Sequence, residues 1–444
     1  MKILNFCNYT KNEIKKNLFI FISFLFYFIL IFFIINHIGN FYIHNFGVKA
    51  PLFDYFCGWC LALFLLLLLI ILPIKFKNYL LSAWFLKVFI IFFFDYIYES
   101  HYKSLDMYSY FNIAKNTPSY LLKTFNDTHN MVAILSYLYI LFPTSSSLAT
   151  VFCAFIGLIA LFIFYKGASL IIGHDSKALL MFLLFTPSLL FWSTILGKDP
   201  IVLFLISLYF LGLAIFIKRT GLKMLSTSAF LIIFAFIGFI FFRFWLIGIF
   251  GISLFLSFLV LEKIKNYKKV LITIIFMPII FFAGFIILHR FHIYNLQSYV
   301  YFMSRISHSW AQGGSAQNIT FSSFKGYLIN MPFMIFTALF RPLIWEGHNL
   351  FQLFAGLQNT VLLIFFIYAV YRLKFLSLKN DKLRILLINI FVWSFICAPI
   401  SFQNLGSANR FEIQILPFII TYIFIGLKFK ELPINEKSQN SFYI

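Results

Sequence analysis

The side chains best suited to chemistry in this sequence are acids, histidines and arginines outside its long apolar stretches. One stretch, LDMYSYFNIA at residues 105–114, carries an acid at helical spacing from aromatic rings. As a helix it places Tyr102, Asp106, Tyr110 and Ala114 on one stripe. A carboxylate near such an apolar surface could have a raised pKa and act as a general base toward a hydroxyl group. An ordinary solvated helix acid is the alternative, and the sequence alone favours it.

Arginines supply the second candidate feature. Most of them fall on the side of the predicted membrane that also holds Asp106, against the usual bias of basic residues, namely Arg243, Arg290, Arg305, Arg341 and Arg410. Guanidinium groups bind phosphate oxygens in pairs and stabilise a phosphate leaving group. Anchoring to lipid headgroups is the alternative for any single arginine. Arg341 in FRPLIWEGHN and Arg410 in NLGSANRFEIQILP are the strongest phosphate candidates.

Further polar residues on that side are candidates for substrate contacts. Lys198 and Asp199 share a short turn, KDP. The two side chains form a local ion pair in the simpler interpretation, and they contact a phosphate or another part of the substrate in the functional one. The other candidates are Glu99, Tyr110, His129, Glu346 and His348. Glu346 with His348, or His289 with His292, could contribute ligands to a divalent metal, but no HExxH or paired CxxC pattern accompanies them. No cofactor is therefore assigned, and a metal stays open.

These residues must be positioned by membrane-spanning helices. Of 444 residues, 62% are hydrophobic and 11% are charged, which is typical of membrane proteins and leaves no room for a large soluble domain. Apolar stretches of about 20 residues, the length that a spanning helix needs, recur along the chain and predict about twelve spans in an all-α polytopic protein. The predicted spans are 18–36, 55–74, 80–96, 148–170, 178–196, 201–217, 224–242, 244–261, 270–288, 350–371, 383–400 and 411–429.

The net charge of +21 follows membrane topology, because Lys and Arg are dispersed among apolar spans instead of forming one nucleic-acid-binding face. Most of the 35 Lys and Arg fall in segments that are cytoplasmic if both termini are cytoplasmic. Lys87 lies within a predicted span, so it either snorkels toward the inner surface or pairs inside the bundle.

The loops divide the chain into four parts. Residues 1–79 form an N-terminal two-helix hairpin, and 80–288 form a core with a long outer loop at 97–147. A second long outer loop covers 289–349, and 350–444 hold the last spans and a short tail. Within the first loop, 131–142 is too short to span, so it lies in the interface or re-enters the membrane.

Several function classes are disfavoured. The chain has no GxxxxGK[ST] loop, no GxGxxG after a strand and no GxSxG elbow, which argues against ATP-driven transport, nucleotide cofactors and serine hydrolase chemistry. Cys57 and Cys60 have the redox CxxC spacing but open an apolar helix, so packing is the default interpretation.

From the third span onward, the chain resembles the GT-C superfamily of polytopic glycosyltransferases. The resemblance rests on Asp106, Tyr110 and Ala114 in the first outer loop, on HNMVAILSYLYILFPTSSSLA, and on ALLMFLLFTPSLLFWSTILGKDP. It implies a site on the outer face that uses a polyprenyl-linked sugar, with Asp106 as the base and arginines on the donor phosphate. Two spans precede the matching region, and the acidic pair of many members is absent.

The sequence thus predicts a transferase in a bacterial inner membrane that moves a sugar from a polyprenyl carrier to a glycan or lipid acceptor. FRPLIWEGHN and NLGSANR also resemble membrane proteins of bacterial surface-polysaccharide loci. A polysaccharide polymerase or ligase with arginine-centred chemistry is therefore one alternative. A lipid-linked oligosaccharide flippase or other secondary transporter is another, although the long outer loops argue against it.

Overall fold

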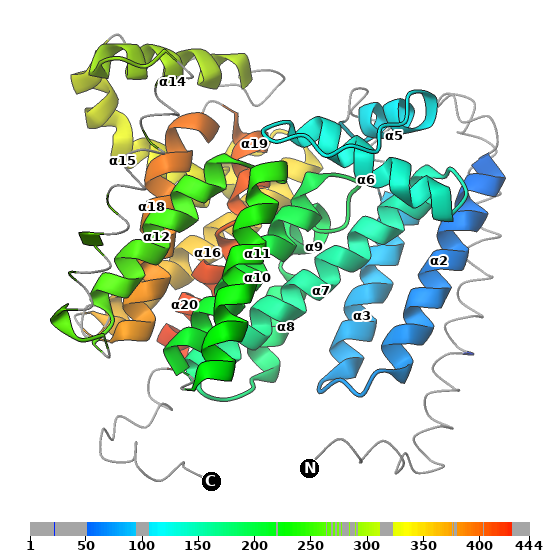
Figure 1. Ribbon diagram of the computed structural model, residues 1–444, viewed down its shortest axis with the longest axis horizontal. Helices are drawn as coiled ribbons and strands as arrows, with labels where there is room; N and C mark the ends of the chain where they lie inside the picture. Colours follow the sequence, from blue (N-terminus) through cyan, green and yellow to red (C-terminus); the bar gives the residue numbers. More distant parts are fainter. Residues whose placement is uncertain are drawn as a thin grey trace. The chain divides into compact units, whose positions relative to one another are not determined.

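The computed structural model describes most of the chain as helices (Figure 1). The described residues are 51–94, 106–218, 221–262, 292–310, 323–374, 380–402 and 404–428, with isolated positions at 22, 376 and between 264 and 289. Glu99, Tyr102 and Arg290 lie outside them.

Six helices among the described residues are long and apolar enough to cross a membrane, or seven spans if one bent pair counts as a span. The six are α2 (Pro51–Ile71), α7 (Ser146–Ile172), α10 (Lys198–Lys218), α11 (Leu222–Phe242), α16 (Leu350–Leu373) and α18 (Asp381–Ser401). They confirm six of the twelve predicted spans and the all-helical membrane class.

The other six predicted spans are not confirmed as single long helices. Residues 18–36 and most of 270–288 lie outside the described part of the chain. Residues 80–96 correspond to α3 (Lys77–Phe89), which continues into the π-helical turn η2 (Ile90–Phe94). Residues 244–261 correspond to α12 (Trp245–Val260), an apolar helix of 16 residues.

Proline explains the largest departure from the predicted spans. Residues 178–196 fold as α8 (Lys177–Phe185) and α9 (Pro187–Trp192), separated at Thr186. Pro187 has no N–H to continue the ladder of α8 and is well suited to begin a new helix. The residues after Trp192 leave helical geometry until α10 begins at Lys198.

A second break divides the last predicted span. Residues 411–429 contain the end of α19 (Leu405–Glu412) and all of α20 (Leu416–Leu427), and these two helices are bent by 66° at the break. Pro417 lies in the first turn of α20. The remaining helices are α5 (Asp106–Asn116), α6 (Asp127–Leu141), α14 (Leu296–Trp310), α15 (Phe324–Phe340) and the 3-10 turn η3 (Ile344–Glu346).

The chain divides into two compact units, which are described separately. The first comprises Met1–Ala160 and Ser193–Phe204, and the second comprises Leu161–Trp192 and Leu205–Ile444. Helices α7 and α10 contribute residues to both.

In the first unit, α2 packs against α3, and α5 packs against α6. The rings of Trp59 and Phe92 stack at 4.1 Å between their centroids. Asp54 of α2 accepts hydrogen bonds from the backbone N–H groups of Ser146 (2.6 Å) and Ser147 (3.2 Å) and from both hydroxyl groups. A carboxylate at this position satisfies N–H groups that the first turn of α7 leaves unpaired and complements the helix dipole.

Lys87 of α3 is fully buried in the first unit. Its Nζ donates to the carbonyl oxygen (2.9 Å) and hydroxyl group (2.7 Å) of Ser193 and to the hydroxyl group of Thr194 (3.0 Å). It therefore pairs inside the protein, with hydroxyl and carbonyl oxygens. Gly157 of α7 approaches the same segment so closely that an added Cβ would lie 2.0 Å from the Ser193 oxygen.

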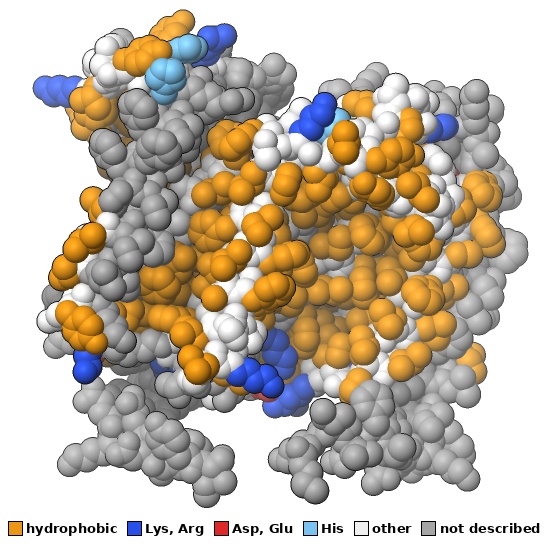
Figure 2. Space-filling view, viewed as in Figure 1, with side chains coloured by type: hydrophobic (Ala, Val, Ile, Leu, Met, Phe, Trp, Pro, Cys, Tyr) orange, Lys and Arg blue, Asp and Glu red, His pale blue; other side chains and the backbone are white. Residues whose placement is uncertain are grey.

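In the second unit, an aromatic core joins several of the spanning helices. The ring of Phe164 stacks on Phe210 with centroids 4.3 Å apart, and Phe418 of α20 lies 4.9 Å from Phe210. By contrast, only 22% of the apolar window in α11 and in α16 is buried. A hydrophobic surface covers the visible side of α11 in Figure 2, as expected for a helix that faces lipid.

Candidate functional site

Several polar and charged side chains of the second unit lie on or against the short helix α19. It begins at Asn404, whose side-chain oxygen accepts hydrogen bonds from the backbone N–H groups of Gly406 (2.9 Å) and Ser407 (3.1 Å). Asparagine is among the preferred residues at this capping position. The helix contacts α9, α15 and α18, so residues far apart in sequence meet around it.

Arg410 lies on this helix, next to α9. Its guanidinium carbon is 5.7 Å from the ring centroid of Trp192. Helix α9 is held there by Ser188, whose hydroxyl group donates to the side-chain oxygen of Asn409 (3.1 Å). The backbone N–H of Ser188 also donates to Gln358 of α16 (2.6 Å). The contact between Arg410 and Trp192 therefore rests on a polar frame that joins three helices.

Arg243 reaches α19 from the junction of α11 and α12. It is 3% exposed, and its guanidinium carbon lies 4.5 Å from the ring centroid of Phe411 and 5.6 Å from that of Trp245. Cations are attracted to the faces of aromatic rings, most strongly where water is excluded. Two of the predicted phosphate-binding arginines, Arg243 and Arg410, thus converge on one helix.

Glu412 is a buried acid that the sequence analysis did not select. It ends α19 and is 1% exposed, and neither carboxylate oxygen has a hydrogen-bond partner among the described residues. Leaving a buried carboxylate without hydrogen bonds is costly, so such residues are candidates for function. The sequence offered one indication that Glu412 belongs to this site, because it follows Arg410 by two residues in NRFEIQ.

Arg341, another predicted phosphate ligand, pairs with Glu346 in the structure. Its Nε donates to the two Glu346 oxygens at 2.8 and 3.1 Å, and its terminal nitrogens contact Glu346 and Thr337. Burial alone would raise the pKa of Glu346. Hydrogen bonds from Arg341 and from the Leu343 N–H, together with the arginine charge, outweigh burial and hold that pKa below its usual value. This pair shapes the turn before α16, where His348 is exposed.

The outer-loop candidates of the first unit form a separate group on α5 and α6. Lys198 pairs with Asp127 at 2.8 Å and lies over the ring of Tyr110, 5.7 Å from its centroid. Asp199 is fully buried. The ion pair that Lys198 makes is therefore with Asp127 of α6 and not with its sequence neighbour.

Asp106 opens α5 and is exposed, whereas Tyr110 and Ala114 on the same stripe are buried. Tyr102, the other ring on the expected stripe, lies outside the described residues, so the expectation that aromatic rings enclose Asp106 stays a prediction. The exposed position of Asp106 agrees with the simpler interpretation of a solvated acid.

His129 and Arg305 lie on α6 and α14, outside the set of contacts around α19 described above. The Nε2 atom of His129 lies 2.9 Å from the Leu121 carbonyl oxygen and 3.1 Å from the Ser119 hydroxyl group, which ties down the loop between α5 and α6. Arg305 is exposed on α14. Within the described ranges, no group of three or more His, Cys, Asp or Glu side chains could hold a metal ion.

Comparison with known proteins gives no match: no family model fits the chain, and no curated protein or solved structure is similar to it.

Proposed function

We propose that this protein transfers a sugar from a polyprenyl-linked donor to a glycan or lipid acceptor at the outer face of a bacterial inner membrane. The observation that carries the proposal is the arrangement around α19, where Arg243 and Arg410 lie against aromatic rings beside membrane-spanning helices. A lipid-linked phosphate reaches a protein at the bilayer edge, and paired guanidinium groups suit its oxygens.

In this proposal Arg410 and Arg243 hold the donor phosphate, and Asp106 is the base. Asp106 takes the proton of an acceptor hydroxyl group as its oxygen attacks the anomeric carbon. The bond from that carbon to the phosphate oxygen breaks, and the phosphate leaves with the electron pair, so the sugar carbon is inverted. The arginines stabilise the charge that develops on the leaving phosphate.

The same proposal includes the finer architecture: about twelve spans in a GT-C-like arrangement, with both termini cytoplasmic. The six helices of spanning length support its multi-pass helical character. For the catalytic acid, the proposal rests on the spacing of Asp106, Tyr110 and Ala114, all of which lie on α5.

The test is transfer of label by the purified full-length protein in vesicles that contain radiolabelled polyprenyl-linked sugars. We expect label to leave the lipid with wild-type protein, and Arg410→Ala to lower the rate at least tenfold while Arg410→Lys retains part of it. Asp106→Asn should abolish transfer, with Asn112→Asp, another exposed α5 position, as the matched control. Label that stays on every donor lipid contradicts the proposal.

A polysaccharide polymerase or ligase is the second candidate, and a specific observation favours it. Arg243, Arg410 and the buried acid Glu412 all lie on or against α19 within one unit. That group offers arginine-centred chemistry without Asp106. Full activity in Asp106→Asn, with loss in Arg410→Ala and Glu412→Gln, selects this candidate over the first.

A further inference from the structure

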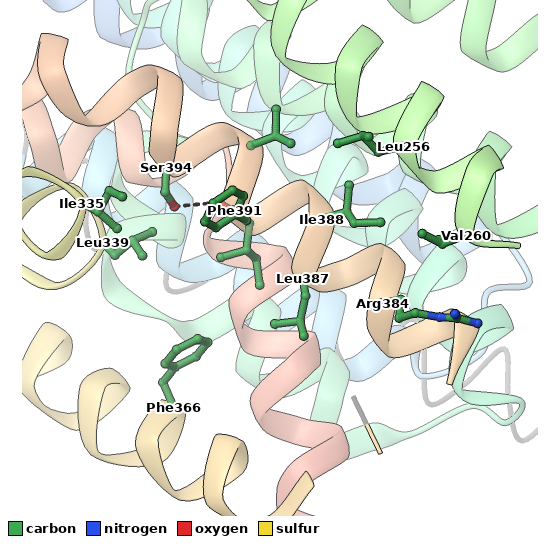
Figure 3. A pocket seen from close by; sticks show the side chains of 12 residues that line it. Leu256, Val260, Ile335, Leu339, Phe366, Arg384, Leu387, Ile388, Phe391 and Ser394 are labelled. Carbon is green, nitrogen blue, oxygen red and sulfur yellow. Dashed lines mark hydrogen bonds between the residues drawn. The ribbon is translucent and has the colours of Figure 1, made fainter. Parts of the chain in front are cut away.

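An apolar groove runs along one side of α18 in the second unit (Figure 3). Its volume is about 560 Å³, within the range of cavities that bind small molecules. The residues that line it on α18 include Leu387, Ile388 and Phe391. Leu256 of α12, Ile335 of α15 and Phe366 of α16 contribute to the other walls.

The groove offers hydrocarbon contacts along most of its length. The hydroxyl group of Ser394 is used within α18, where it donates to the Ile390 carbonyl oxygen at 2.6 Å. Phe391, on the groove wall, is 65% exposed. Because α18 is one of the helices of spanning length, its exposed apolar side chains face the bilayer. The ligand that suits this groove is therefore a flexible hydrocarbon chain.

One end of the groove is charged. Arg384 lines it near the start of α18 and pairs with Glu262 at 3.0 Å and with Asp381. Its Nε is buried and has no hydrogen-bond partner among the described residues. A buried guanidinium N–H that is unpaired is costly, so an additional acceptor at this end would lower the free energy.

Two lysines add positive charge at the same end of α18. Lys382 lies two positions before Arg384 on α18, and the charge of Lys218, at the end of α10, acts on its side chain. Two ammonium groups cannot satisfy each other, and their mutual repulsion is relieved by an anion. The start of α18 therefore combines an apolar groove with three nearby cationic groups, of which Arg384 pairs with two carboxylates.

We propose that this groove binds one hydrocarbon chain of an anionic phospholipid, with the phosphate of that lipid at the end that Arg384 lines, in the positive field of the nearby Lys382. The hydrocarbon chain lies along the apolar wall, and the phosphate accepts a hydrogen bond from the Nε of Arg384, which has no other acceptor among the described residues. This binding site is separate from α19 and does not depend on the proposed glycosyl transfer. A polyprenyl phosphate shares the same chemistry, so the experiment must distinguish the two lipids.

The first test uses the wild-type protein and a phosphatidylglycerol that carries a photoreactive diazirine in its acyl chain. After irradiation in phosphatidylcholine vesicles, we expect crosslinked peptides from α18, α15 or α12, and competition by unlabelled phosphatidylglycerol but not by phosphatidylcholine. Crosslinks confined to other helices, or equal competition by phosphatidylcholine, overturn the proposal. Stronger competition by polyprenyl phosphate than by phosphatidylglycerol overturns the choice of phospholipid.

The second test uses variants and native mass spectrometry of protein released from phosphatidylglycerol vesicles. Leu387→Trp fills the groove and should lower the retained lipid at least fivefold. Ile364→Trp, an equally apolar change at an exposed α16 position outside the groove, should leave retention unchanged. Lys382→Gln should remove most of the preference for phosphatidylglycerol over phosphatidylcholine. Unchanged retention in Leu387→Trp contradicts the site.

Discussion

Gly157 marks the closest helix contact in the first unit, and its side chain can be enlarged as a test of that contact. An alanine Cβ there would lie 2.0 Å from the backbone oxygen of Ser193, which also accepts from Lys87. Because this neighbour is backbone, Gly157→Ala should destabilise the protein by about 3 kcal/mol or more. Gly248 of α12 has open space around it, so Gly248→Ala should be neutral or stabilise by up to about 1 kcal/mol. Thermal denaturation in detergent separates the two outcomes, and equal melting temperatures would contradict the predicted crowding at Gly157.

Glu346 gives a prediction for the dependence of stability on pH. Its pKa in the folded protein lies below the ordinary value of 4.5, so as the pH falls the unfolded chain takes up a proton first. The stability that Glu346 provides is therefore constant above the ordinary value, declines below it, and is lost as the pH falls through the lowered pKa.

The measurement is the difference in melting temperature between wild type and Glu346→Gln. We expect this difference to be constant from neutral pH down to about 5 and to shrink at lower pH. Glu262→Gln is the control, since Glu262 is 75% exposed and its pair with Arg384 is screened by solvent. A difference that grows as the pH falls would contradict the assignment.

Single residues also show what the sequence could and could not predict. Arg243 and Arg410 were selected because arginine on the less basic side of a membrane needs an explanation. In the structure, Arg410 belongs to α19 and Arg243 lies against Phe411 of the same helix. Glu412 was missed because its burial depends on how α9, α15 and α18 pack around α19. That packing cannot be predicted from the residues next to Glu412 in the sequence. For the same reason, the sequence did not predict that Lys198 pairs with Asp127, which lies 71 positions away.

At the scale of elements, the cap of α19 can be tested separately from its arginine. Asn404→Ala removes the acceptor for two backbone N–H groups and should destabilise by about 1 kcal/mol. If α19 carries the donor phosphate, the same change should also lower the rate of sugar transfer. Asn404→Asp keeps the acceptor and should preserve both properties. Thermal denaturation and the transfer assay measure them, and an unaffected melting temperature in Asn404→Ala would show that the cap contributes little.

Helix lengths were predictable wherever apolar residues run without interruption. Both α10 and α11 match the predicted spans to within a few residues, because about 20 apolar residues leave few alternatives to a spanning helix. Hydrophobicity alone did not predict the breaks at Pro187 and before Pro417. Proline changes the backbone hydrogen bonds without lowering the apolar content, so a count of apolar residues does not detect the break in the helix.

At the scale of the whole molecule, the proposed orientation in the membrane rests on the distribution of Lys and Arg and can be measured directly. In a background without the native cysteines, Ser109→Cys on α5 and Ser226→Cys on α11 both place a thiol at an exposed position. A maleimide that cannot cross the membrane should label residue 109 in intact cells and residue 226 only after permeabilisation. The reverse labelling pattern would contradict the proposal that the site faces the outside of the cell.

The carboxylate of Asp54 imposes an order on biogenesis. Its four hydrogen-bond donors belong to residues 92 and 93 positions further along the chain, so Asp54 leaves the ribosome well before they exist. These four hydrogen bonds form only after synthesis has reached the start of α7, so the contact between α2 and α7 is completed late.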